Sequence, residues 1–271
     1  MSDDELPDHL KVPEALKTHP ELIKRNLVLD HPLNIGSVYA TSGHTPPQFA
    51  VKILDPASEE EAIVDRLQRD TSSRNHLIPC EIIRADRTLL VMPYVFRVDR
   101  PIRRERDPVK RLLVLLKVFH QIAEGVDHLH GLHIAHIDLC YGNVMAALED
   151  SERAHPRTKA GRVYIIDFDR SRQLELGPGR QPAIELPSTQ YKPPLHMKSF
   201  DPYSWDVYCM GNLFERLTTE AFRPSPPPWF LVKLCRWMIG DERGCSGVFG
   251  KHVALIRGLF VTLRSPTLAR E

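Results

Sequence analysis

The first third of the chain alternates short apolar runs with turn residues, a pattern typical of β-strands. It predicts four strands, at residues 37–41, 48–54, 80–85 and 88–94. One segment with helical periodicity, residues 59–69, interrupts the strands. A β-rich region with a single helix is therefore expected.

The pattern becomes helical after Val95. Between residues 109 and 130 the apolar side chains recur at the spacing of one buried helical face. These residues are Leu112, Leu115, Leu116, Phe119, Ile122, Val126 and Leu129. Two more helices are predicted at residues 205–217 and 229–239.

These two patterns predict one α+β domain with two lobes. Residues 27–95 would form a small β-rich lobe with one helix, and residues 96–271 a larger, mainly helical lobe. Residues 1–26 are charged and interrupted by prolines, so we expect a leader that docks loosely if at all. The segments 149–161 and 176–188 are charged or rich in Gly and Pro, and we expect them to be mobile.

The amino-acid composition limits the classes of binding partner that we expect. The 271 residues carry 36 Lys plus Arg against 35 Asp plus Glu, which gives no reason to expect nucleic acid or an anionic membrane as the main partner. The amino terminus is acidic, and no stretch approaches the roughly 20 apolar residues that span a bilayer. We therefore expect no membrane segment and an intracellular, cytoplasmic location. The five cysteines include no C-x-x-C pair, so neither a disulfide framework nor a zinc site is expected.

Candidate chemistry appears in the segment HIAHIDLCYGNVM at residues 133–145. Its residues His136, Asp138 and Asn143 have the spacing H-x-D-x-x-x-x-N. A carboxylate there can orient a substrate hydroxyl and accept its proton, and an amide five residues later can reach a metal. Taken alone, the spacing is only moderately specific, because Asp138 could equally be a turn residue.

Three further polar residues are candidates for the same site. In VYIIDFD an apolar strand leads to Asp167, a hard carboxylate suited to Mg²⁺ bridging two phosphates. In FAVKIL the strand carries Lys52, and Glu60 starts the helix predicted after it. Singly, each has an ordinary explanation as a strand-edge lysine, a surface acid or a loop carboxylate. Their order along the chain is the informative feature.

In this order the segments resemble the eukaryotic-type protein kinase superfamily, with its V-A-I-K strand, helix Glu, H-R-D loop and D-F-G motif. TQYKPP and WDVYCMGNLFERL look like the end of the activation segment and the D-V-x-S-x-G helix of that family. The resemblance covers roughly residues 27–240 and implies a bilobal, protein-kinase-like fold with ATP and Mg²⁺ as cofactors. The catalytic residues that it implies are Asp138, Lys52, Asn143 and Asp167, of which Asn143 and Asp167 hold the metal.

The same resemblance implies a nucleotide site and two structural roles. LLVMPYV looks like the last small-lobe strand entering the hinge. The implied nucleotide-binding residues are Gly36, Val38, Ala50, Lys52, Glu60, Met92, Tyr94 and Met145. Asp206 would hold the catalytic-loop backbone, and His136, Phe168 and Val64 would form an apolar column joining the lobes.

Several positions depart from the family pattern. His31 and Leu33 replace two glycines of the Gly-rich loop, so backbone cradling of phosphate should be poorer. Ile137 replaces the Arg of H-R-D, and Asp169 replaces the Gly of D-F-G. Cys140 replaces a lysine that neutralises the transferred phosphoryl, and such a loss costs a few kcal/mol of transition-state stabilisation. Slow turnover is expected.

Three functions remain open at this point. The first is a protein kinase that transfers the γ-phosphoryl of Mg·ATP to a Ser or Thr hydroxyl of an unidentified protein substrate. The second is a pseudokinase scaffold that binds nucleotide or a partner protein with negligible transfer. The third is a small-molecule kinase resembling aminoglycoside or choline phosphotransferases, which share the H-x-D loop; TQYKPP and WDVYCMG count against it.

Overall fold

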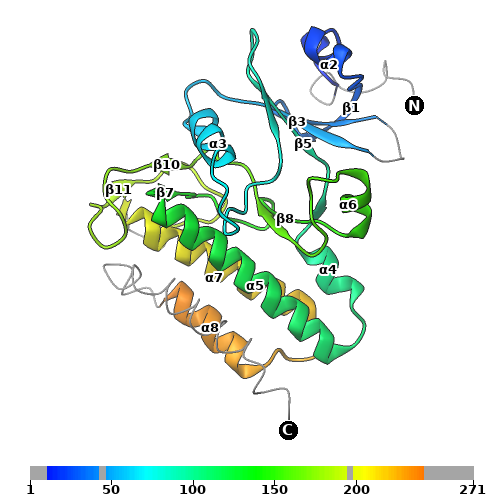
Figure 1. Ribbon diagram of the computed structural model, residues 1–271. Helices are drawn as coiled ribbons and strands as arrows, with labels where there is room; N and C mark the ends of the chain where they lie inside the picture. Colours follow the sequence, from blue (N-terminus) through cyan, green and yellow to red (C-terminus); the bar gives the residue numbers. More distant parts are fainter. Residues whose placement is uncertain (1–10, 43–46, 194–197, 241–271) are drawn as a thin grey trace.

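The computed structural model describes residues 11–42, 47–193 and 198–240. As expected, the protein is mixed α+β, with a β-sheet in its amino-terminal region and mainly helices in its carboxy-terminal region (Figure 1). In the described part of the chain, no helix is both long and apolar enough to cross a membrane. The four cysteines that fall in these ranges are free and buried, and Cys245 lies outside them.

The amino-terminal sheet has five antiparallel strands in the order β1-β2-β3-β5-β4. The strands are β1 (Leu29–Asn34), β2 (Val38–Thr41), β3 (Phe49–Ile53), β4 (Glu81–Ile83) and β5 (Leu89–Pro93). The four predicted strands are confirmed, whereas β1 is additional. It contains Pro32, is mostly exposed and pairs irregularly with β2, as an edge strand can.

Helix α3 (Glu60–Gln68) confirms the predicted helix between the strands. It buries Ile63, Val64 and Leu67 in the main core, as its apolar spacing requires. Glu60, in its first turn, is also fully buried. A carboxylate at that depth needs partners, and here they are the Lys52 ammonium and the Phe168 N–H.

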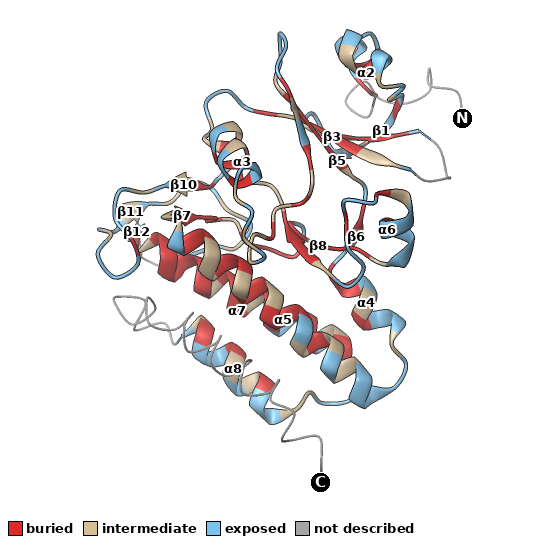
Figure 2. Ribbon diagram, in the orientation of Figure 1, coloured by how far each residue is buried: buried red, intermediate tan, exposed pale blue. Residues whose placement is uncertain are grey.

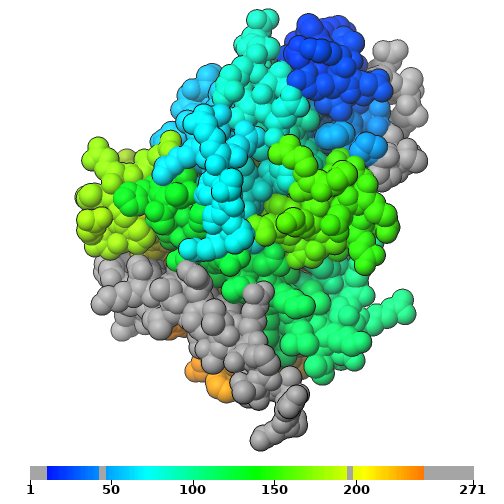
Figure 3. Space-filling view, viewed as in Figure 1, coloured from blue at the N-terminus to red at the C-terminus, as the bar shows by residue number. Residues whose placement is uncertain are grey.

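The amino-terminal segment packs against the sheet, so the prediction of loose docking is wrong for residues 11–26. Two short helices, α1 (Glu14–Lys17) and α2 (Pro20–Lys24), place Leu16 and Leu22 in a second core cluster with sheet residues such as Tyr39. Figure 3 shows this segment, in dark blue, seated against the sheet region. Residues 1–10 of the expected leader lie outside the described residues.

In the part of the carboxy-terminal region that the structure describes, the helices that pack together are α4 (Asp99–Arg104), α5 (Pro108–Gly131), α7 (Pro202–Phe222) and α8 (Trp229–Ile239). The helices predicted at 109–130, 205–217 and 229–239 are thereby confirmed. Helices α5 and α7 lie side by side, and their facing sides are buried (Figure 2). Phe119 stacks on Phe214 across this contact with ring centroids 3.7 Å apart. Gly211 lets α8 approach α7, because a Cβ there would lie 2.8 Å from Met238 Cβ.

Short strands connect the sheet region to the helices. They are β6 (Phe96–Arg97), β7 (Ile134–Ala135), β8 (Val144–Ala146), β9 (Val163–Ile165), β10 (Arg172–Gln173), β11 (Ile184–Glu185) and β12 (Ser199–Phe200). β6, β8 and β9 form one small sheet, and β7 pairs with β10. The pairs β8–β9 and β7–β10 fix the loops that follow β7 and β9 against each other.

Segment 149–161 does not match the expectation of mobility. It forms α6 (Glu149–Ala154) and a turn, in which Ser151 and Thr158 are buried. The Thr158 hydroxyl donates to the carbonyls of Ser151 and His155, at 3.1 and 2.8 Å. Polar contacts order this segment, so an apolar period is not required. Segment 176–188 contains β11 and is otherwise largely exposed.

Candidate functional site

A cavity of about 390 Å³ lies between the sheet and the helical region. Eight of the residues implied by the family resemblance line it: Val38, Ala50, Lys52, Met92, Tyr94, Asn143, Met145 and Asp167. Leu33, Asn34, Cys140 and Gln190 also line the cavity, although the sequence did not mark them as contacts. The strands contribute an apolar wall, and the loops contribute the polar groups.

Two predicted nucleotide-binding residues do not line this cavity. Gly36 has a φ of +81°, the left-handed conformation of the turn between β1 and β2, and it borders a separate cavity of about 720 Å³. Leu33 and Asn34 of β1 face the main cavity instead. Glu60 is fully buried behind the wall, so its contact with a ligand would be made through Lys52.

Lys52 joins three elements. From β3, its Nζ donates to Glu60 Oε2 of α3 and to Asp167 Oδ1 of the loop after β9, both at 2.5 Å. Its side chain and that of Glu60 are buried, whereas Asp167 is about one-third exposed, with 34% of its side chain accessible. The backbone N–H of Phe168 donates to the other Glu60 oxygen at 3.0 Å. The lysine predicted to contact phosphates is therefore tied to both carboxylates.

The electrostatics of this cluster favour a charged lysine. Burial lowers the pKa of Lys52, but Asp167 and Glu60 more than offset it, so the net pKa is raised. Burial raises the pKa of Glu60, and here the neighbouring Lys52 opposes the shift without cancelling it. In an exposed Lys–Glu pair the pKa of the carboxylate would be lowered. Here the pKa of Glu60 is raised because its side chain is fully buried, and the pKa of Lys52 is raised because two carboxylates contact it.

The loop after β7 contains a strained residue. Ile137 has a φ of +67°, a conformation that is rare for a β-branched side chain and costs of order 1–3 kcal/mol. The backbone N–H groups of His136 and Ile137 donate to the carboxylate of Asp206 at 2.8 and 2.6 Å. The indole of Trp205 donates to the carbonyl of Ile137 at 2.7 Å. Helix α7 thus fixes this loop from below, as expected for Asp206.

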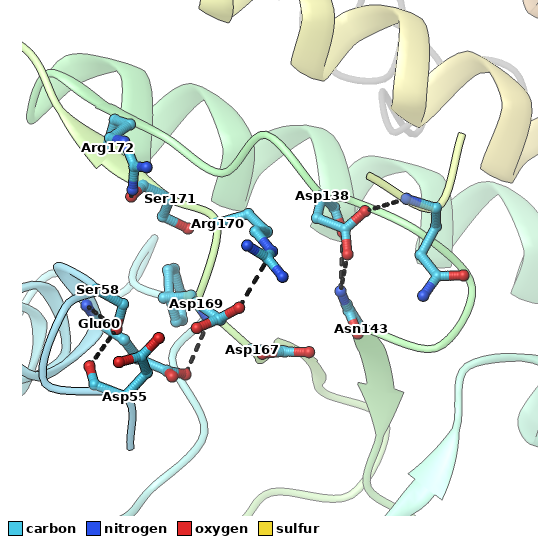
Figure 4. Close-up of polar contacts among 12 residues, drawn as sticks. Asp55, Ser58, Glu60, Asp138, Asn143, Asp167, Asp169, Arg170, Ser171 and Arg172 are labelled. Atoms are coloured by element: carbon cyan, nitrogen blue, oxygen red, sulfur yellow. Dashed lines mark hydrogen bonds and ion pairs between the residues drawn. The ribbon is translucent and has the colours of Figure 1, made fainter. Parts of the chain in front are cut away.

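Asp138 follows this strained residue; it does not itself line the cavity but contacts Asn143 and Gln190, which do. Its Oδ1 accepts the backbone N–H of Gln190 at 2.7 Å, and its Oδ2 accepts from the Asn143 amide at 3.3 Å. The same amide donates to the Asp138 carbonyl at 2.8 Å, which leaves the amide oxygen of Asn143 as an acceptor outside these contacts. Burial raises the pKa of Asp138, and the Gln190 N–H opposes the rise. Figure 4 shows Asp138, Asn143 and Asp167 gathered at one place.

Asp167 also has a left-handed backbone, with a φ of +67°. The residue after it, Phe168, is buried, and its ring lies 5.1 Å from that of His136. Val64 of α3 belongs to the same core cluster. The expected apolar column of these three residues is consistent with this packing.

The donor set suits a magnesium–nucleotide ligand. Asn143 and Asp167 present hard oxygen atoms on the cavity wall, the type of ligand that Mg²⁺ prefers. Within the described ranges, no group of three or more His, Cys, Asp or Glu could hold a metal. A magnesium ion at this place would therefore depend on phosphate oxygens as well as on the protein, as is usual for this ion.

No family model and no curated protein matches this chain. The function is therefore inferred from the side chains around the cavity. The contact of Gln190 with Asp138 was not predicted from the sequence, because it is made by a backbone N–H. A backbone donor leaves no signature in residue type.

Proposed function

We propose that the chain is a divergent, bilobal protein-kinase-like domain that transfers the γ-phosphoryl of Mg·ATP to a Ser or Thr hydroxyl of a protein substrate. The main observation in support is the Lys52 bridge between Glu60 and Asp167, at a cavity that Asn143 also lines, with Asp138 in contact with Asn143. Each residue is unremarkable alone. A buried lysine, a metal-type carboxylate and a second carboxylate at one cavity suit phosphoryl transfer.

Each group has a distinct role in this proposal. The apolar wall, with Ala50, Met92 and Met145, would take the adenine. Lys52 would contact the α- and β-phosphates, and Asn143 with Asp167 would hold Mg²⁺. The bound ion would neutralise phosphate charge. Asp138 would orient the acceptor hydroxyl and receive its proton, so that catalysis depends mainly on positioning and electrostatics.

The two oxygen atoms of the Asp138 carboxylate are held to different degrees, as a general base needs. Its contact with Asn143 is long, at 3.3 Å, so Oδ2 is the oxygen more readily offered to a hydroxyl. Oδ1 is held by the Gln190 N–H at 2.7 Å, which orients the carboxylate. Its raised pKa brings the base closer to neutral pH, where a general base is more effective.

A pseudokinase is the alternative that a specific observation favours. Gln190 occupies one oxygen of Asp138 and also lines the cavity, so it lies where an acceptor would approach. Leu33 and Cys140 at the cavity add neither a phosphate cradle nor a cation. A scaffold that binds nucleotide without transferring phosphate would tolerate all three features.

The test is a radiolabelled Mg·ATP assay on the wild type, Lys52→Ala and Asp138→Asn. The probes are autophosphorylation, a mixed Ser/Thr peptide library, and a panel of aminoglycosides and choline, with nucleotide binding measured in parallel. Transfer to peptide by the wild type, lost in both variants while Asp138→Asn still binds Mg·ATP, is the expected result. Binding without transfer, unchanged in Asp138→Asn, would establish the pseudokinase. Transfer to a metabolite and never to peptide would establish the small-molecule kinase.

A further inference from the structure

The polar side of the cavity has an excess of negative groups. Figure 4 draws Asp169 and Asp138 on either side of Asp167, and a nucleotide would bring its own negative charge to these carboxylates. Lys52 is already engaged by Glu60 and Asp167. Phosphoryl transfer places further charge on the moving group and needs a cation near it.

Cys140 does not provide that cation. It lines the cavity two residues after Asp138, and its side chain is neutral at physiological pH, because burial raises the pKa of the thiol to about 11. The catalytic loop therefore offers no positive side chain on the acceptor side of the cavity.

Of the two arginines labelled in Figure 4, Arg170 is the one drawn between Asp169 and Asp138. Its Nε lies 3.2 Å from Asp169 Oδ2, and its guanidinium extends from that carboxylate toward the side where Asp138 lies. The side chain is 48% exposed, so it is free to meet a ligand entering from solvent.

The backbone around Arg170 is fixed on both sides. Ser171 is buried, its N–H donates to the Phe168 carbonyl at 3.0 Å, and its hydroxyl donates to the His136 carbonyl at 3.1 Å. This turn ties Arg170 to the same loop that holds Asp138. The next arginine, Arg172, lies instead beside Glu59, with Nε 3.9 Å from Glu59 Oε1.

We infer that Arg170, oriented by Asp169, is a further catalytic residue whose guanidinium stabilises the transferred phosphoryl in place of the cation that Cys140 lacks. The inference rests on the proposed function. In the step that it assists, the bond from the γ-phosphorus to the β,γ-bridging oxygen breaks and ADP leaves. A bond from the acceptor hydroxyl oxygen to the γ-phosphorus forms, and the hydroxyl proton passes to Asp138.

The inference also accounts for Asp169. A third carboxylate near a phosphate site would repel the ligand, but its pairing with Arg170 compensates the charge and orients the guanidinium. The two unusual residues are then explained together. Cys140 leaves the loop after β7 without a cation, and Asp169 orients the cation that the segment after β9 supplies instead.

The experiment compares Arg170→Gln and Arg170→Lys with the matched control Arg172→Gln. The first readout is calorimetric binding of Mg·ADP with and without aluminium fluoride, a mimic of the transferred phosphoryl. We expect Arg170→Gln to bind Mg·ADP within about threefold of the wild type and to lose most of the extra affinity gained with aluminium fluoride. Arg170→Lys should retain part of that gain, and the control all of it.

The second readout is kcat on the mixed Ser/Thr peptide library. Arg170→Gln should lower kcat by about 10²-fold, the typical cost of removing one transition-state donor. Adding Cys140→Lys to Arg170→Gln should restore at least tenfold, because it returns a cation from the other loop. Such rescue is not expected if Arg170 acts only on folding.

The outcomes separate the two proposals. Wild-type transfer that Arg170→Gln leaves unchanged overturns the role of Arg170 and leaves the kinase function standing. Loss of activity accompanied by a lower unfolding midpoint, without rescue by Cys140→Lys, likewise overturns it. A wild type that neither transfers phosphate nor gains affinity with aluminium fluoride overturns both.

Discussion

Asp206 accepts the backbone N–H of Ile137 at 2.6 Å, and through this hydrogen bond helix α7 holds the strained turn next to Asp138. The same carboxylate accepts the His136 N–H and contacts His130 Nε2 at 2.8 Å. It is fully buried. One side chain thus satisfies several groups that have no access to water, and it couples the stability of the core to the geometry of the loop.

Asp206→Ala should therefore destabilise the protein by about 3 kcal/mol or more, since hydrogen bonds to charged groups contribute about 1.5–3 kcal/mol each. Asp206→Asn keeps one acceptor and should cost less. Denaturant unfolding of both variants measures the difference. A cost below about 0.5 kcal/mol for the Ala variant would show that Asp206 does not support the loop.

The sequence predicts elements wherever apolar residues recur with a clear period. Helices α5 and α8 match the predicted ranges within a residue or two because each buries one continuous face. Strand β1 lacks such a signal, since Pro32 interrupts it and most of it is exposed. The docking of residues 11–26 was missed because it depends on a few dispersed apolar residues, such as Leu16 and Leu22.

Some residues of the candidate site could be predicted from the sequence and others could not. Lys52, Glu60 and Asp167 could be predicted, because residue type and order are enough to mark them. The Gln190 contact to Asp138 could not be predicted, because its donor is a backbone N–H. The direction of Arg170 depends on the turn between Phe168 and Ser171, which only the folded chain defines.

Leu22 and Ile23 give a matched test of the docked amino-terminal segment. Leu22 is 1% exposed in the second core cluster, whereas Ile23 is 62% exposed. Leu22→Ala should cost about 2–4 kcal/mol, as for buried leucines, and Ile23→Ala no more than about 0.5 kcal/mol. Thermal unfolding and amide exchange in β1 and β2 measure this. Equal effects for the two variants would contradict docking.

The Lys52–Glu60 pair should behave as a coupled buried unit. Lys52→Met leaves Glu60 buried without its cation and should cost about 3–5 kcal/mol. Glu60→Gln in the same chain removes that charge, while its amide oxygen can still accept the Phe168 N–H. The double variant should therefore be more stable than Lys52→Met. Unfolding of the four proteins gives the coupling energy, and simple additivity would show that the two side chains do not stabilise each other.

Asp138 provides the pH prediction. Burial raises its folded-state pKa above the ordinary aspartate value, so at neutral pH the ionised carboxylate is less favourable in the folded protein than in the unfolded chain. Asp138→Asn removes this cost, and Asn can still accept the Gln190 N–H through its side-chain oxygen. The variant should therefore unfold at a higher temperature than the wild type, by about 1 kcal/mol of stability, while losing phosphoryl transfer.

The sign of the pH dependence distinguishes this account from a general surface effect. Because the folded pKa is the higher one, the wild type regains stability relative to Asp138→Asn as the pH falls through it, and the gap between the two proteins should close in acid. The transfer rate should fall over the same range, since a protonated Asp138 cannot accept the hydroxyl proton. Unfolding midpoints and initial rates, each followed from neutral pH down to about pH 4, measure both curves. A stability gap that stays constant with pH, or an Asp138→Asn variant less stable than the wild type, would show that the Asp138 carboxylate is not held at an energetic cost.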